Sequence, residues 1–150
     1  MDYQVRAARI TDVERLVAVL ESGGALAAGT SAAADVLRQL VSLPQASILI
    51  AESHRKIVGG AVLSLRPSPA AGSNVGVIDV LAVADGADPV GVTDILLTEL
   101  IRSARNKGCR VVEAATPSDT SVRARWSRFG FEDSGPRLAC AIGAPGGRAT

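Results

Sequence analysis

The sequence predicts a mixed α/β domain in which a central sheet carries helices on its faces. Three observations predict this class. The apolar residues change from helical spacing to short extended runs, and back, several times along the chain. The run at residues 75–83 is nearly all apolar, which is typical of a strand covered on both faces. The chain has 150 residues, 47% of them hydrophobic, so we expect one domain over residues 1–150.

Composition excludes several classes of partner and site. Sixteen Lys and Arg residues against 15 Asp and Glu residues leave a net charge of +1, which argues against nucleic acid as the main partner. The two cysteines, Cys109 and Cys140, are too few for a disulfide framework and lack the spacing of metal ligands. No apolar run approaches the roughly 20 residues that span a bilayer, so we expect a cytoplasmic protein without a membrane partner.

The first half of the chain predicts a strand, two helices and a hairpin. Thr11 followed by Glu14 has the pattern of a capping box at the start of the first helix. Pro67, Pro69 and the glycines at 72 and 76 predict a long loop after the hairpin. The expected ranges are a strand at 3–8, helices ending near 22 and 42, and strands at 47–51 and 57–63.

The second half predicts the element that carries ligand chemistry. A strand at 75–83 is followed by a loop and by a helix that ends before Gly108. The start of such a helix offers unpaired N–H groups and a partial positive charge, which favour phosphate. A strand at 109–115, a helix at 118–128, a strand at 137–142 and a fraying tail at 143–150 follow. The complete order is β-α-α-β-β-β-α-β-α-β.

Four stretches together resemble the GNAT superfamily of acyl-CoA-dependent N-acetyltransferases. Residues 6–12 (RAARITD) are similar to its opening R-x-A-x-x-x-D turn, and residues 57–59 (IVG) to the end of its second hairpin. Residues 78–83 (IDVLAV) match the strand before its cofactor loop, and residues 128–132 (RFGFE) are similar to its K-x-G-F-E signature. The resemblance covers nearly the whole chain and implies a GNAT-like fold.

The resemblance also implies an acetyl-CoA site. In the family, the strand before the loop pairs with pantetheine, and a loop of pattern R/Q-x-x-G-x-G/A holds the diphosphate. Residues 88–93 read DPVGVT, so the middle glycine matches, Asp88 adds a negative charge and Pro89 lacks an N–H. Thr93 replaces a small residue, although its hydroxyl could donate to a phosphate. The implied cofactor-binding residues are Leu81, Ala82, Val83, Val90, Gly91, Val92, Thr93 and Asp94.

The expected catalytic residues are Asp79 and Ser127. Asp79 lies where family members often carry an acid that takes the amine proton, and Glu113 is a poorer candidate. The tyrosine that protonates the leaving thiolate in many members is replaced by Trp126, whose indole N–H donates a hydrogen bond without releasing a proton. That proton would come from water or Ser127. The family's nearby asparagine becomes Asp119.

Two functions from different classes remain. The first is an N-acetyltransferase that moves an acetyl group from acetyl-CoA to an amine of a small molecule or protein, by direct transfer in a ternary complex. The second is a catalytically impaired GNAT-like module for acyl-CoA binding, sensing or protein interaction. The resemblance leaves a homodimer open, since dimers are common among similar proteins. Structural readings also stand: Asp79 as a cap or ion-pair partner, and Trp126 as core or pocket wall.

Overall fold

A five-stranded sheet forms the centre of the protein. The computed structural model describes residues 2–117, 120–135 and 140–141. The strands lie in the order β1-β2-β3-β4-β5; the pairs β1–β2, β2–β3 and β3–β4 are antiparallel, and the pair β4–β5 is parallel. The elements are β1 (Gln4–Ala7), η1 (Ile10–Asp12), α1 (Val13–Ser22), α2 (Thr30–Val41), β2 (Ala46–Ser53), β3 (Lys56–Ser68), β4 (Ser73–Val83), α3 (Pro89–Asn106), β5 (Cys109–Ala114) and α4 (Thr120–Ser127).

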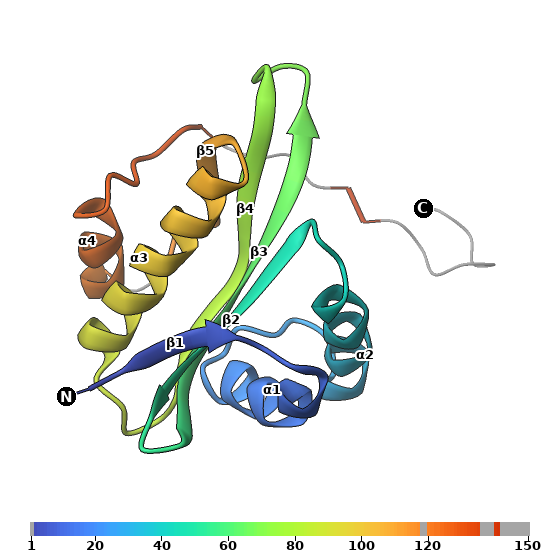
Figure 1. Ribbon diagram of the computed structural model, residues 1–150. Coiled ribbons are helices and arrows are strands. Elements are labelled where there is room, and N and C mark those ends of the chain that lie inside the picture. Colours follow the sequence, from blue (N-terminus) through green and yellow to red (C-terminus); the bar gives the residue numbers. More distant parts are fainter. Residues whose placement is uncertain (1, 118–119, 136–139, 142–150) are drawn as a thin grey trace.

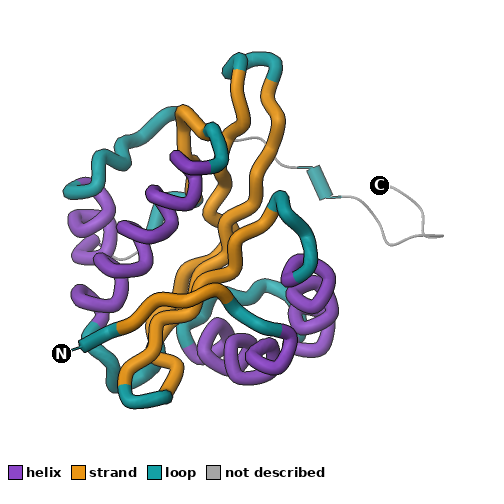
Figure 2. Tube along the Cα trace, viewed as in Figure 1, coloured by secondary structure: helices purple, strands orange, loops and turns teal. Residues whose placement is uncertain are grey.

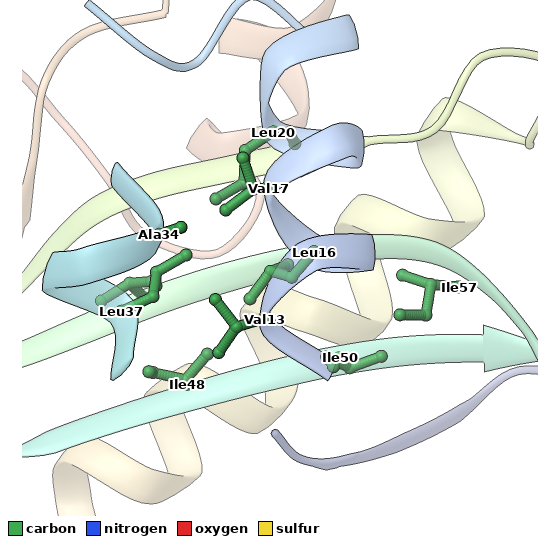
Figure 3. Close-up of a cluster of buried hydrophobic side chains, with 11 residues drawn as sticks. Val13, Leu16, Val17, Leu20, Ala34, Leu37, Ile48, Ile50 and Ile57 are labelled. Atoms are coloured by element: carbon green, nitrogen blue, oxygen red, sulfur yellow. The ribbon is translucent and has the colours of Figure 1, made fainter. Parts of the chain in front are cut away.

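Helices cover the sheet in two layers, each with its own core. Helices α1 and α2 lie on one face, and α3 and α4 on the other (Figures 1 and 2). Val13, Leu16 and Leu20 recur at helical spacing in α1 and pack on the sheet with Ile48 and Ile50 (Figure 3). On the opposite face the buried side of α3 packs against residues of β3 and β4 and against Trp126 of α4.

The predicted fold class and the order of the first nine elements are confirmed. The helix and strand boundaries differ from the expected ones by a few residues. The strand expected at 137–142 and the tail at 143–150 lie outside the described residues, except Cys140 and Ala141, which belong to no helix or strand.

The long loop predicted around residues 67–76 is wrong. Strands β3 and β4 stay paired to Ser68 and Ser73, so the turn between them is short. Pro67 is tolerated because β2 pairs with β3 only as far as Ser64, which makes this part of β3 an edge strand. Gly72 provides the positive φ of 68° that the turn needs.

The capping box predicted at Thr11 and Glu14 is also wrong. A 3-10 turn at Ile10–Asp12 runs directly into α1, and the carboxylate that accepts a backbone hydrogen bond is Asp12. Its Oδ2 accepts from the N–H of Arg9 at 2.7 Å. The same pattern of a polar residue and an acid three positions later therefore begins two residues earlier than predicted.

A β-bulge in β4 positions the part of the fold that matters for ligand binding. Val62 pairs with Val80 whereas Leu63 pairs with Ile78, so Asp79 is the extra residue. Beyond the bulge, Val80 and Ala82 pack towards α1 and α2, and Leu81 and Val83 pack towards α3. The bulge therefore shifts the alternation of β4 by one residue.

Candidate functional site

The outer edge of β4 is open beyond the bulge. Pairing with β5 ends at Ile78 and Ala114, whereas β4 continues to Val83 and stays paired with β3 on its other edge. Successive residues of a strand direct their N–H and C=O groups to opposite edges. No other described strand pairs with residues 79–83 on the β5 side, so this edge can form a ladder with an extended amide-bearing ligand.

The start of α3 follows this open strand after a short loop. Asp88 is the N-cap, and Pro89 occupies the first turn. Asp88 Oδ1 accepts a hydrogen bond from the Val90 N–H at 3.2 Å. One of the donors that a helix start could offer to a phosphate is therefore already held by a carboxylate of the chain.

The side chains of Asp88 and Tyr3 lie close to the backbone of Gly91. A Cβ added at this residue would lie 2.7 Å from Asp88 Oδ2 and 3.1 Å from Tyr3 Cε2, so a side chain here would force both to move. A shallow, open groove of about 720 Å³ runs along this surface, with Gln4, Asp94 and further residues in its lining. The N-terminal end of the chain lies beside the start of α3 (Figure 1).

An ion pair ties α4 to the first turns of α3. The Arg125 guanidinium donates to both carboxylate oxygens of Asp94. This hydrogen bonding holds the pKa of Asp94 below its ordinary value, and the charge of Arg128 adds to the effect. The pKa of Arg125 is raised chiefly by Asp94, with a further contribution from the charge of Asp88. Arg125 thus places a cation beside the acidic start of α3, and sequence reasoning missed it.

The cofactor-binding residues predicted from the resemblance are brought to one region but play different parts in it. The side chains of Val92 and Thr93 are buried, at 0% and 5% exposure, so any contact of Thr93 with a phosphate needs its hydroxyl to turn outward. Val90 is half exposed on the first turn. The remaining members are the backbone of the open strand at Leu81, Ala82 and Val83, and Gly91 and Asp94 of α3.

The two predicted catalytic residues occupy different elements. Asp79 is exposed at the bulge, and its side chain makes no hydrogen bond or ion pair with another described residue. Ser127 is the last residue of α4, and its hydroxyl donates to the Arg123 carbonyl at 3.1 Å. No direct contact joins the two side chains. Asp119, the third departure from the family pattern, lies outside the described residues.

Trp126 forms part of the core beside this region. Its side chain is 7% exposed and meets the Phe131 ring edge to face, with centroids 5.0 Å apart at 63°. The interpretation of Trp126 as core or pocket wall is therefore confirmed. Within the described part of the chain, its Nε1 is the one buried side-chain nitrogen or oxygen without a hydrogen-bond partner.

Other chemistries find no support in the described residues. Over residues 2–117, 120–135 and 140–141, no group of three or more His, Cys, Asp and Glu side chains is arranged to hold a metal ion. No helix in these ranges is both long and apolar enough to cross a bilayer. Cys109 and Cys140 are free, and burial raises the pKa of the Cys109 thiol, which disfavours a nucleophilic thiolate there.

Comparison with known proteins agrees with this geometry. The model of the acetyltransferase (GNAT) family matches residues 15–131. No curated protein matches the chain.

Three solved structures illustrate the shared fold. The structure of AAC(6')-Iy in complex with the bisubstrate analog CoA-S-monomethyl-acetylneamine superposes with a TM-score of 0.81 at 20% identity, covering 96% of this chain and 100% of that one. A ribosomal-protein-alanine N-acetyltransferase from Brucella melitensis biovar Abortus 2308 gives 0.74 at 16%, covering 95% and 100%. A transcriptional regulator from Bacillus halodurans C-125 gives 0.79 at 18%, covering 94% and 100%.

Proposed function

Because this chain belongs to the acetyltransferase (GNAT) family, we propose that it moves an acetyl group from acetyl-CoA to an amine. The acceptor is the amine of a small molecule or a protein, and the transfer is direct within a ternary complex. The observation that carries this proposal is the open edge of β4 beyond the Asp79 bulge. This edge offers backbone groups to an amide-bearing arm and ends beside the start of α3.

The residues of the candidate site fit the pantetheine arm of acetyl-CoA better than its diphosphate. The backbone at Leu81, Ala82 and Val83 suits the two amides of the pantetheine arm, which can continue the sheet. The first turn of α3 would hold the diphosphate chiefly through the Gly91 N–H, because Pro89 has no N–H, the Val90 N–H donates to the Asp88 side chain and the Val92 N–H donates to the Asp88 carbonyl at 3.1 Å. Asp88 opposes this second contact, because its carboxylate already accepts from Val90 and repels phosphate.

Three groups of the protein would take part in the acetyl transfer: Asp79, a backbone N–H of β4 and Ser127. When bound, acetyl-CoA supplies the acetyl group as a thioester that a neutral amine can attack. Asp79, exposed beside the open edge, takes the amine proton directly or through water. A backbone N–H of the open strand polarises the carbonyl that is attacked. The leaving CoA thiolate takes a proton from water, or from Ser127, whose own proton is then restored from water; for the second route the Ser127 hydroxyl must leave the Arg123 carbonyl.

A specific observation favours the alternative function. The carboxylate of Asp88 lies at the helix start, where we expect it to weaken diphosphate binding, and this favours a GNAT-like module that has lost catalysis and serves acyl-CoA binding, sensing or protein interaction. Thermal unfolding with saturating acetyl-CoA addresses binding first. At 100 times its dissociation constant, a ligand adds about 2.7 kcal/mol of stability. An unchanged unfolding temperature in saturating acetyl-CoA would reject the proposal of an acetyl-CoA-dependent enzyme.

The catalytic assignment is tested by release of free CoA across a panel of amines. With an accepted amine, Asp79→Asn should lower kcat by roughly a hundredfold or more while the affinity for acetyl-CoA stays unchanged. Glu113→Gln is the matched control, because it removes a carboxylate from the neighbouring strand β5. An unchanged kcat in Asp79→Asn would reject Asp79 as the base, and a selective loss in Glu113→Gln would move that role to Glu113.

A further inference from the structure

The segment that contains β4, the following loop and most of α3 carries no cation of its own. From residue 67 to residue 101 the sequence has no Lys, Arg or His. The charged residues in this range are all acidic, namely Asp79, Asp85, Asp88, Asp94 and Glu99. A cation for an anionic ligand at the start of α3 must therefore come from another element of the fold.

Helix α4 carries the opposite charge. Residues 120–128 contain Arg123, Arg125 and Arg128 and no Asp or Glu. Arg123 donates to the Pro117 carbonyl at 3.4 Å, so it is held within its own part of the chain. Arg125 instead reaches across to Asp94 in α3. The structure thus sets a cation of α4 directly against the acidic segment.

The Arg125 guanidinium has donors to spare. Its Nε and Nη2 donate to the two carboxylate oxygens of Asp94, and Nη1 makes no hydrogen bond with another described residue. The two side chains are 26% and 28% exposed, so a ligand can reach the pair. The pKa of Arg125 is raised chiefly by Asp94 and further by the charge of Asp88, which indicates that the guanidinium lies within electrostatic range of the N-cap of α3.

We propose that Arg125 supplies the cation for the diphosphate of the acyl donor, with Nη1 donating to a phosphate oxygen while Nε and Nη2 stay on Asp94. This inference rests on the proposed function, because it requires the diphosphate to lie at the start of α3. Charge-assisted hydrogen bonds from a guanidinium to phosphate are among the strong ones. Arg125 thereby offsets the carboxylate of Asp88, and Asp94 is a positioning residue that holds the guanidinium in place.

Calorimetric titration with acetyl-CoA tests the contact. In Arg125→Gln we expect the dissociation constant to rise about fivefold to twentyfold, and the difference to narrow at high salt. Arg125→Lys should lose less affinity, because it keeps the charge but not the planar fork of donors. Arg102→Gln is the matched control. Arg102 also pairs with an acid of α3, Glu99, but it lies towards the other end of the helix, so its loss should leave the affinity unchanged.

Asp94→Asn separates the ligand contact from the packing of α4 on α3. This variant breaks the same ion pair as Arg125→Gln, yet it keeps the cation and removes a negative charge. We therefore expect Asp94→Asn to bind acetyl-CoA as tightly as the unmodified protein or more tightly. An equal loss of affinity in Asp94→Asn and Arg125→Gln would show that the pair acts only by joining the two helices, and would reject the inference.

A second ligand identifies the phosphate that Arg125 contacts, since acetyl-CoA also carries a 3′-phosphate. In titrations with 3′-dephospho-acetyl-CoA, which keeps the diphosphate, Arg125→Gln should show the same relative loss of affinity. Equal binding of this ligand by Arg125→Gln and the unmodified protein would move the contact to the 3′-phosphate and overturn the assignment to the diphosphate.

The outcomes separate this inference from the proposed function. If acetyl-CoA binds with equal affinity to Arg125→Gln and to the unmodified protein, the inference is wrong and the function stands. If acetyl-CoA does not bind the unmodified protein, the acetyl-CoA-dependent function fails and the inference fails with it.

Discussion

Asp88 places a carboxylate of the chain itself at the first turn of α3. It caps the helix by accepting a hydrogen bond from the Val90 N–H, and its Oδ2 occupies the space that a Cβ of residue 91 would need. Taken from the sequence alone, residues 88–93 are a damaged phosphate loop. In the structure the Asp-Pro pair is also a well-formed helix start, with Asp as N-cap and Pro in the first turn. The Asp-Pro pattern of a helix start can be recognised in the sequence. It explains what the departure of residues 88–93 from the family's loop pattern contributes, which is a stable start of α3.

Asp88→Asn should strengthen the binding of acetyl-CoA. Asparagine caps helices as well as aspartate does, so the helix start is preserved while the negative charge is removed. We expect the dissociation constant to fall by about threefold to tenfold at low salt, and by less at high salt, in calorimetric titrations.

Asp85→Asn is the control for this effect, because it removes the same charge from an exposed position in the same loop without touching the cap. A gain in affinity confined to Asp88→Asn identifies the capping carboxylate as the competitor. Equal gains in both variants would reduce the effect to general repulsion, and no gain in either would reject the competition.

At the scale of elements, the junction of β3 and α3 fixes the helix start relative to the sheet. A Cβ at Gly59 would lie 2.5 Å from Val92 Cγ1 and 3.0 Å from the Ala82 carbonyl oxygen. The absence of a side chain at Gly59 therefore allows the start of α3 to approach β3 closely.

Gly59→Ala should disturb this approach. We expect the free energy of unfolding in urea to fall by about 1–3 kcal/mol, because the added methyl group overpacks the junction. Gly29→Ser is the control, since a Cβ at Gly29 would meet nothing within 4 Å, Gly29 has an ordinary φ of −66°, and serine is a preferred residue at the N-cap of α2 that Gly29 occupies. Stability equal in the two variants would show that the junction relaxes freely and does not set the position of α3.

The helices and strands that could be predicted are those whose apolar residues recur at a regular spacing without interruption. Val13, Leu16, Val17 and Leu20 define α1, and the buried stripe of α3 was readable in the same way. The bulge at Asp79 could not be read, because the residues after it are apolar on both faces of β4 and show no change of alternation. Arg125 was missed because its partner, Asp94, is far away in the sequence and only the packing of α4 on α3 joins them.

At the scale of the whole molecule, stability should depend on pH through Asp12. This carboxylate is 2% exposed and contacts the guanidinium groups of Arg6 and Arg15 and the N–H of Arg9. Its hydrogen bonds with Arg6 hold the pKa of Asp12 well below its ordinary value. A lowered folded pKa stabilises the protein above the unfolded pKa of about 3.9, and that contribution is lost as the pH falls towards the folded pKa.

Asp12→Asn should therefore lower the free energy of unfolding by about 3 kcal/mol near neutral pH and flatten its decline in acid. Urea unfolding from about pH 7 to about pH 3 measures both effects. Asp35→Asn serves as control, because its ion pair with Arg38 is exposed and should contribute under about 1 kcal/mol. An equally steep acid decline in Asp12→Asn and the unmodified protein would assign the pH dependence to other groups.

Hydrogen–deuterium exchange with and without saturating acetyl-CoA tests most directly whether the open edge of β4 receives the acyl donor. We expect slower exchange of the backbone amides in residues 79–83 and in the first turn of α3, with α1 on the opposite face of the sheet unchanged. Unchanged exchange in residues 79–83 under conditions where acetyl-CoA is bound, or protection confined to another surface, would contradict the proposed site.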